Sequence, residues 1–372
     1  VDTSWTSSGD SLAGFGSANW HLLPRLDLTT GLRYTYEWKH AQVARTRYGG
    51  DPNASVLAAG DPFLDVLDAA LGTNVEQYGF NGIIDDVAGG PYARADSLRE
   101  GNWSGQAALS YKLAPDVLSY ASVARGYKGG GINLGFIGAS IKPTFAPEQA
   151  TSYEIGIKAR LFERRLSLAF DIYQADIRNY QALTFDNEMT LLQNPRQINL
   201  LNVGQVRLRG AELEGYGYAA PGLMLRAGVA LSDAITTEFH SAPDEDNQQN
   251  DRDLSGQRLY DAPRWSGNLG AEYGYVSDEP CEPYGAVDWS ARTGYYGTVE
   301  HGRASYINGS RLLNLRAGLR ARDHEWDVSL WMRNALNEKY VATVYPLYGV
   351  GDYGAVPGDP RTWGVTLRAD LK

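Results

Sequence analysis

The stretch Leu26-Asp27-Leu28-Thr29-Thr30-Gly31-Leu32-Arg33-Tyr34-Thr35-Tyr36-Glu37-Trp38 alternates between two kinds of side chain. Its apolar and aromatic residues all occupy even positions, and its charged residues all occupy odd positions. Successive side chains of a β-strand point to opposite faces, so a period of two predicts a strand. One face of this strand is apolar and ends in three aromatic rings, while the other face is polar.

The same alternation recurs along most of the chain. It is clear in segments 103–111, 153–161, 166–173, 223–232, 265–273, 287–295, 313–319, 326–332 and 363–371, whereas 12–22 and 117–127 fit either phase. No run of about 18 apolar residues occurs, which excludes helical membrane spans. Strands that are apolar outside, polar inside and bordered by aromatic rings are typical of outer-membrane barrels. The sequence therefore predicts an all-β fold, a transmembrane antiparallel β-barrel with about thirteen strands present.

The phase of each strand predicts which side chains face lipid and which face the barrel lumen. We expect lipid-facing positions at Tyr34, Ile155, Phe170, Val229 and Leu315, and lumen-facing positions at Arg33, Glu154, Asp171, Arg226 and Arg316. A charged, hydrated lumen wall would also include Glu37, Lys158, Glu272, Arg292, Arg320, Arg333 and Arg368. Most of these charges are expected to be structural, paired with one another along the wall.

Short and long connections alternate between the predicted strands. Short turns rich in Pro, Gly and Asp are predicted at 23–25, 114–116, 162–164, 220–222, 278–283 and 322–324, and long loops at about 39–101, 128–149, 185–203, 236–261, 299–310 and 338–360. Transmembrane barrels have short periplasmic turns and long extracellular loops. Both the first and the last strand then descend to the periplasm, so the strand number is odd, and we expect residues 1–372 to be the C-terminal portion of a longer barrel.

Composition limits the function classes. The net charge of −10 provides no basic surface for nucleic acid. The chain begins Val1-Asp2 without a signal peptide, so an export signal is expected to lie upstream or to have been removed. No catalytic motif of a hydrolase is present, which argues against an enzyme. No cofactor or metal site is predicted, because the histidines are scattered and the acidic segment 244–253 lacks the pattern of an EF-hand.

Six motifs resemble those of the TonB-dependent outer-membrane receptors, in the order found in that family. They are Leu118–Gly131 with Asn133 ("YAS-x-x-RGYK-x-GG-x-N"), Phe145–Lys158, Asn202–Gly204 with Arg209–Glu214, Leu254–Pro263, Asn334–Tyr340, and Pro360–Gly364. Two departures are Ala335, where leucine is usual, and the end at Leu371-Lys372, where an aromatic residue is usual. The resemblance covers most of the chain from about residue 11.

The resemblance implies a 22-stranded barrel in the cell outer membrane of a Gram-negative bacterium, with an N-terminal plug domain that is not present in this sequence. It implies a transporter that captures a scarce substrate such as an iron-siderophore through its extracellular loops. Import would use energy from the TonB complex, reached through the plug, while the barrel wall contacts outer-membrane lipid. Two alternatives stay open, a passive porin of about 16 strands, and a soluble β-propeller or sandwich or an adhesive binding module.

Candidate ligand contacts are three tyrosines in the last long loop. Tyr345, Tyr348 and Tyr353 offer flat rings with hydroxyl groups, which suit an aromatic or sugar-like substrate. The glycine cluster Gly129–Gly131 is not followed by the Lys and Ser or Thr of a phosphate-binding loop, and loop flexibility is its expected role.

Overall fold

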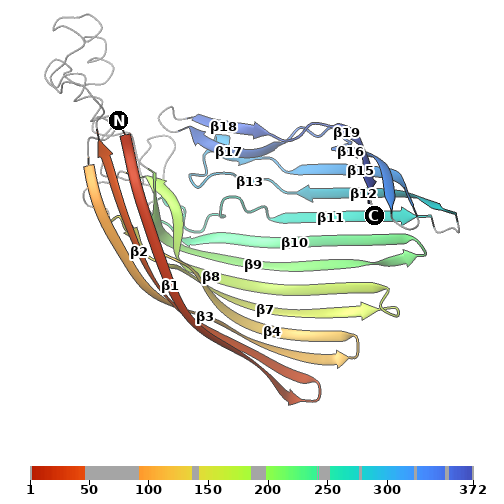
Figure 1. The fold of residues 1–372 in the computed structure, drawn as a ribbon, viewed down its shortest axis with the longest axis horizontal. Coiled ribbons are helices and arrows are strands. Elements are labelled where there is room, and N and C mark those ends of the chain that lie inside the picture. Colours follow the sequence, from red (N-terminus) through yellow and green to blue (C-terminus); the bar gives the residue numbers. More distant parts are fainter. Residues whose placement is uncertain are drawn as a thin grey trace, which may run out of the picture.

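The structure is a computed structural model that describes residues 2–46, 92–135, 142–185, 198–240, 242, 252–275, 279–321, 325–347 and 352–370. Its main feature is one 13-stranded sheet in which every neighbouring pair is antiparallel, and Figure 1 shows that this sheet is strongly curved. No helix among these residues is long and apolar enough to cross a membrane.

The strands of the sheet follow the chain order, with three small hairpins inserted between them. The sheet contains β1 (Asp2–Leu23), β2 (Leu26–Thr46), β3 (Tyr92–Ala114), β4 (Val117–Lys128), β7 (Glu148–Leu161), β8 (Leu166–Phe185), β9 (Ile198–Ala220), β10 (Leu223–Glu238), β11 (Trp265–Gly274), β12 (Cys281–Arg292), β15 (Ser310–Ala321), β16 (Trp326–Arg333) and β19 (Thr362–Ala369). The antiparallel sheet and its strand number confirm the predicted fold class.

The hairpins lie in the long connections. They are β5 (Gly131–Ile132) with β6 (Thr144–Phe145), β13 (Tyr295–Tyr296) with β14 (Tyr306–Ile307), and β17 (Val341–Leu347) with β18 (Asp352–Pro357); one 3-10 turn, η1, covers Arg303–Ser305. Hydrophobic clusters form here, between loops. Tyr295, Ile307 and Val344 are buried together, which packs the second hairpin against the third.

The predicted turns at 23–25, 114–116, 162–164 and 220–222 fall between β1 and β2, β3 and β4, β7 and β8, and β9 and β10. Residues 322–324 lie outside the described part. Two of the loops were predicted too long. The first was expected at 39–101, but β2 continues to Thr46 and β3 already begins at Tyr92. Likewise, β9 begins at Ile198, inside the predicted loop 185–203. The reason is visible at Ala41 and Val43, which are buried on the charged face and reverse the alternation of residues 26–38.

Strand register separates the two predicted sets of side chains. Paired residues of antiparallel strands share a face, so the face of Tyr34 can be followed through Trp103 and onward across the sheet. One face carries Tyr34, Ile155, Phe170, Val229 and Leu315, and the other carries Arg33, Glu154, Asp171, Arg226 and Arg316. We call these the apolar face and the charged face.

The apolar face is exposed to an extent that a soluble protein would not tolerate. Ile155 is 60% exposed and Leu367 is 72% exposed, and large apolar side chains of almost every strand are exposed with them. Contiguous exposed apolar surface marks an interaction site or a membrane boundary. Register also fixes the two ambiguous strands, since Leu12 and Trp20 of β1 and Val123 of β4 lie on the apolar face.

A pair of neighbouring substitutions on β10 tests the assignment of the two faces. In the intact protein, Val229→Arg places a charge in hydrocarbon and should reduce folding stability in lipid by about 2–4 kcal/mol. Ala230→Arg, one residue along, faces the register partner Glu212 and should be mild. Urea titration of each variant folded into lipid vesicles measures the loss of folding stability. Equal losses for both variants would contradict the assignment.

Candidate functional site

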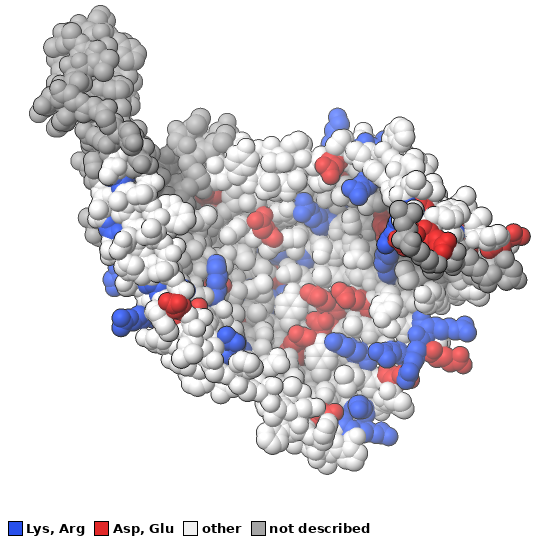
Figure 2. All heavy atoms as spheres, in the orientation of Figure 1, with Lys and Arg blue, Asp and Glu red and all other residues white. Residues whose placement is uncertain are grey.

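The charged face lines the hollow of the curved sheet, where Figure 2 shows acidic and basic side chains gathered. All of the predicted wall residues lie on this face by register, namely Arg33, Glu37, Lys158, Arg226, Glu272, Arg292, Arg316, Arg320, Arg333 and Arg368. That this face bounds the lumen of a closed barrel stays a prediction.

Many of the wall cations have partners within the sheet. Arg320 forms ion pairs of 3.4 Å with both Glu272 and Glu282, and Arg226 is paired with Asp288. Other guanidinium groups lie over aromatic rings, at 5.0 Å for Arg292 over Tyr295, 5.1 Å for Arg333 over Trp331, 5.7 Å for Arg316 over Tyr284 and 5.7 Å for Arg33 over Phe15. These contacts fix the rings and charges of the wall and support a structural role for these residues.

An acidic patch interrupts this pattern on β7, β8 and β9. Its members are Glu154, Asp171, Glu212 and Glu214, and Asp171 and Glu212 are direct register partners. The Tyr120 hydroxyl donates to Glu154 Oε1 at 2.5 Å, and the Lys158 ammonium lies 5.2 Å from the Tyr120 ring. In the described part of the chain, none of the four carboxylates forms an ion pair. The patch therefore carries negative charge toward the hollow.

A cavity of about 520 Å³ lies next to the acidic patch and is lined mainly by residues of β9, β10, β11, β12 and β15. Its lining is rich in hydroxyl and amide groups and includes Ser266, Asn268, Ser290, Ser310, Arg292, Tyr340, Glu212 and Glu214. Such a lining can donate to and accept from a polar occupant. Among the described residues, no three His, Cys, Asp or Glu side chains lie close enough together to hold a metal ion.

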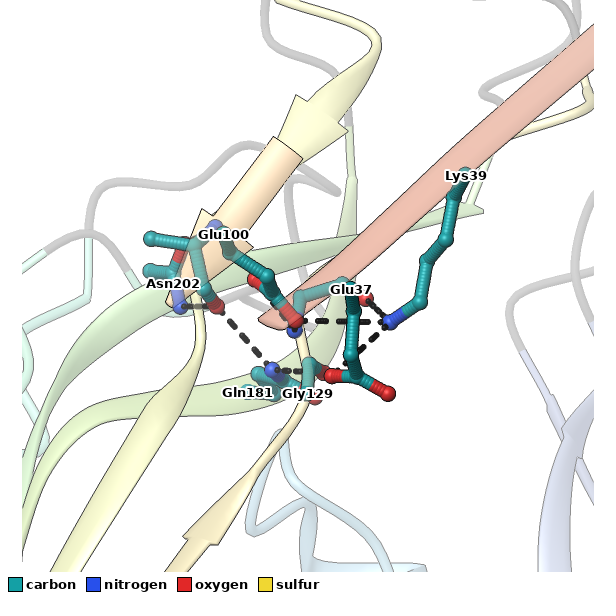
Figure 3. Close-up of polar contacts among 8 residues, drawn as sticks. Glu37, Lys39, Glu100, Gly129, Gln181 and Asn202 are labelled. Atoms are coloured by element: carbon teal, nitrogen blue, oxygen red, sulfur yellow. Dashed lines mark hydrogen bonds and ion pairs between the residues drawn. The ribbon is translucent and has the colours of Figure 1, made fainter. Parts of the chain in front are cut away.

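A polar cluster at the end of the strands opposite the short turns holds the connection between β4 and β7 (Figure 3). Glu100, which is buried, accepts from Gly130 N at 3.0 and 3.1 Å, and Lys39 Nζ donates to Gly130 O at 2.7 Å. Lys39 also lies 3.4 Å from Glu100 and 3.8 Å from Glu37. We call Glu37, Lys39, Glu100 and Gly130 the latch.

Three amides complete the attachment of this connection. Gln181 Nε2 donates to Gly129 O at 3.1 Å and to Ala146 O at 3.0 Å, so one side chain joins both ends of the connection. The Asn202 side chain forms two hydrogen bonds with the backbone of Ala146: its Oδ1 accepts from Ala146 N at 2.7 Å, and its Nδ2 donates to Ala146 O at 2.9 Å. In the same way, Asn133 Nδ2 donates to Leu200 O and Asn133 Oδ1 accepts from Leu200 N, both at 3.0 Å. The connection is therefore fixed to strands on both sides of β4 and β7, namely β2 and β3 on one side and β8 and β9 on the other.

The loop tyrosines do not form one surface. Tyr345 pairs with Gly354, and Pro346 pairs with Tyr353, so Tyr345 and Tyr353 lie on opposite faces of the β17–β18 hairpin. The face of Tyr353 also carries the buried Val344, whereas Tyr345 is 50% exposed. Tyr348 lies outside the described residues. Of the two predicted ligand contacts that the structure describes, Tyr345 is the one that the hairpin presents to solvent.

A family model described as "TonB dependent receptor-like, beta-barrel" matches residues 1–335. The chain belongs to this family. Among curated relatives, the ferric-pyoverdine M114 receptor PbuA of Pseudomonas sp. strain M114 is 25% identical over 314 residues, which is 82% of this chain and 34% of that protein. The chain thus spans about a third of the length of this relative.

Solved receptor structures share the fold of this barrel segment. The ferric yersiniabactin uptake receptor FyuA of Yersinia pestis superposes with a TM-score of 0.74 at 17% identity, covering 100% of this chain and 47% of that one. The siderophore receptor PiuA of Acinetobacter baumannii superposes with a TM-score of 0.69 at 16% identity, covering 98% and 43%. TonB-dependent receptors are transporters rather than enzymes and are located in the outer membrane.

The receptor motifs have structural roles that the sequence alone did not reveal. The glycine cluster was expected to provide loop flexibility, and the structure gives a steric reason for it. A Cβ on Gly130 would lie 2.4 Å from Phe145 O, and one on Gly131 would lie 2.4 Å from the Phe145 ring. Glycine is needed here for close approach. Asn133 and Asn202 belonged to recognised motifs, but Glu100 and Gln181 carried no sequence signal, because their partners are backbone atoms far along the chain.

Removing the latch carboxylate should free the connection between β4 and β7. In the intact receptor, Glu100→Ala leaves the buried Gly130 N–H without its acceptor and removes one partner of the Lys39 ammonium, at a cost of about 1–3 kcal/mol. Hydrogen exchange of residues 128–135 should accelerate while the strands below stay protected. Arg99→Ala, the neighbouring residue on the opposite face, is the control. Unchanged protection in Glu100→Ala would refute the role of the latch.

His301 makes the neighbouring loop sensitive to acid. Burial, with a smaller contribution from Arg252, lowers its pKa to about 4, and its ring stacks on Tyr296 at 4.6 Å. A histidine whose pKa falls from 6.5 to about 4 on folding stabilises the loop above pH 6.5 and loses this contribution as pH falls toward 4. The protection of residues 295–307 against hydrogen exchange, relative to the intrinsic exchange rate at each pH, should therefore fall as the pH is lowered from 6.5 to 4. His301→Gln should flatten this dependence; an unaltered pH profile would contradict it.

Proposed function

We propose that residues 1–372 are the C-terminal part of the barrel of an active transporter, which imports a scarce, large solute such as an iron-siderophore with energy supplied through TonB. The observation that carries the proposal is the charged hollow of a sheet that belongs to the TonB-dependent receptor family. A barrel of about 22 strands is wide enough to leak unless a domain fills it.

The acidic patch favours such a filling domain. Four carboxylates without ion pairs in the described part of the chain attract a basic segment of an occupant inside the hollow, and the cavity beside them offers it hydroxyl and amide groups. An upstream plug domain would bring its own arginines or lysines to Glu212 and Glu214. Interaction with TonB would then be made by the plug, at the periplasmic end.

The two edge strands also favour a larger barrel. Among the described residues, β1 and β19 each pair with a single neighbour. A strand edge exposed to hydrocarbon leaves backbone N–H and C=O groups without partners, which lipid does not tolerate. Additional strands of the intact protein would pair with β1 and β19 and close the barrel. The expected total is 22.

Cargo contact is assigned to the extracellular loops. PbuA, FyuA and PiuA are named as receptors for ferric-pyoverdine, ferric yersiniabactin and a siderophore, which makes an iron-siderophore the favoured cargo class for this chain as well. Tyr345 supports this assignment, since its exposed ring lies across Gly354 on a hairpin whose other face is packed. An aromatic or catecholate group could stack on that ring.

Energised uptake is the test of the proposed function. Cells expressing the intact receptor are supplied with radioactive iron bound to the siderophore that their own culture secretes, with and without a protonophore. We expect surface binding in both cases and uptake only without the protonophore. A receptor-deletion strain gives the background. Receptor-dependent uptake that persists with the protonophore, or in a TonB-deletion strain, would instead identify a passive porin.

A further inference from the structure

The apolar face changes character abruptly near the extracellular ends of β4, β7, β8 and β9. Register aligns Ile155, Ile172 and Ala211 in one row across β7, β8 and β9, and Tyr153, Gln174 and Arg209 in the next. The third row contains Arg125, Thr151, Asp176 and Arg207, and the fourth contains Gln149, Arg178 and Gln205. All of these side chains point away from the hollow. We call Arg125, Arg178, Arg207 and Arg209 the rim arginines.

The charge of the rim arginines is only partly neutralised. Arg207 is paired with Asp176 at 2.7 Å. In contrast, Arg125 Nη2 donates to Gln149 Oε1 at 2.8 Å, and Arg209 Nε donates to Gln174 Oε1 at 2.9 Å. A glutamine amide orients a guanidinium group without cancelling its charge. Within the described residues, Arg125, Arg178 and Arg209 form no ion pair with a carboxylate.

The rim arginines lie at the level of the lipid head groups. Ile155 and Ile172, 60% and 48% exposed, belong to the lipid-facing band, and Tyr153, 52% exposed, begins the next row, where aromatic rings mark the membrane interface. These rows lie at the end of the sheet opposite the short turns, which are periplasmic in barrels of this kind. The arginines therefore border the extracellular leaflet.

We propose that the rim arginines bind the phosphate groups of a glycolipid head group in the extracellular leaflet of the outer membrane. Arginine forms charge-assisted, two-pronged hydrogen bonds with phosphate oxygens. The patch extends over three strand spacings, about 14 Å, and over rows about 7 Å apart, which is wide enough for a head group with two phosphates. The acyl chains of the same lipid would lie on the apolar rows below, at Ile155 and Ile172.

The experiment measures lipid retention by the intact receptor. The protein is purified in neutral detergent and placed in nanodiscs of zwitterionic phospholipid, with or without diphosphorylated lipid A. Native mass spectrometry counts lipid A bound per receptor. The variant Arg125→Gln/Arg178→Gln/Arg209→Gln is compared with Arg25→Gln/Arg160→Gln/Arg165→Gln, which removes the same charge at the periplasmic end. Arg178→Gln alone is a milder variant, since the Arg178 side chain makes no ion pair or hydrogen bond within the described residues.

The proposal expects the rim variant to retain at least about tenfold less lipid A, since it loses three charge-assisted contacts, and the periplasmic-end variant to retain the wild-type amount. Arg178→Gln should show a smaller loss in the same direction, so the test does not depend on the triple variant alone. Equal losses in both triple variants would overturn the proposal by showing unspecific charge attraction. Equal retention of dephosphorylated lipid A, or full displacement by inorganic phosphate, would also overturn it.

Discussion

Every backbone N–H and C=O group inside a membrane has to find a partner within the protein, because hydrocarbon offers none. In this chain the partners are found across neighbouring strands, from β1 to β19, in one continuous antiparallel ladder. The ladder fixes which side chains share a face, so a slip of one residue would move Glu154 into lipid and Ile155 into the hollow. The hollow, its charges and the loops above it all depend on this register.

The alternation of residues predicted the sheet because lipid and water impose opposite demands on neighbouring residues. Residues 26–38 show this most clearly, and Pro24, Pro115 and Gly222 marked turns that the structure contains. Beyond the membrane this contrast disappears. Ala41 and Val43 are then buried on the charged face, so the pattern inverts and the sequence reads as a loop. Strand ends could therefore not be predicted from the pattern that revealed strand centres.

The wall charges of the candidate site could be predicted, because they depend only on which face of a strand a residue occupies. The parts of the site that depend on contacts between residues distant in sequence could not be predicted. The wall charges followed from alternation alone. The latch did not, since Lys39, Glu100 and Gly130 come from three separate parts of the chain and meet only through the pairing of β2, β3 and β4. Similarly, the sequence marked three tyrosines of one loop as candidate ligand contacts, but only hairpin pairing shows that Tyr345 and Tyr353 point to opposite sides. Proximity in sequence says little about a shared surface when side chains alternate.

β2 and β3 extend beyond their predicted ends, and this extension affects which part of the protein a molecule outside the cell contacts first. Beyond Trp38 the ladder between β2 and β3 continues for seven more residues, to Arg45 and Tyr92, about 23 Å along the strand. This projecting wall is hydrogen-bonded sheet, so it keeps its shape when loops move. An antibody or a bacteriophage approaching from outside would touch the tips of these strands well before it reached lipid. Natural variation that escapes such recognition should accordingly concentrate on these tips and spare the strand segments below them.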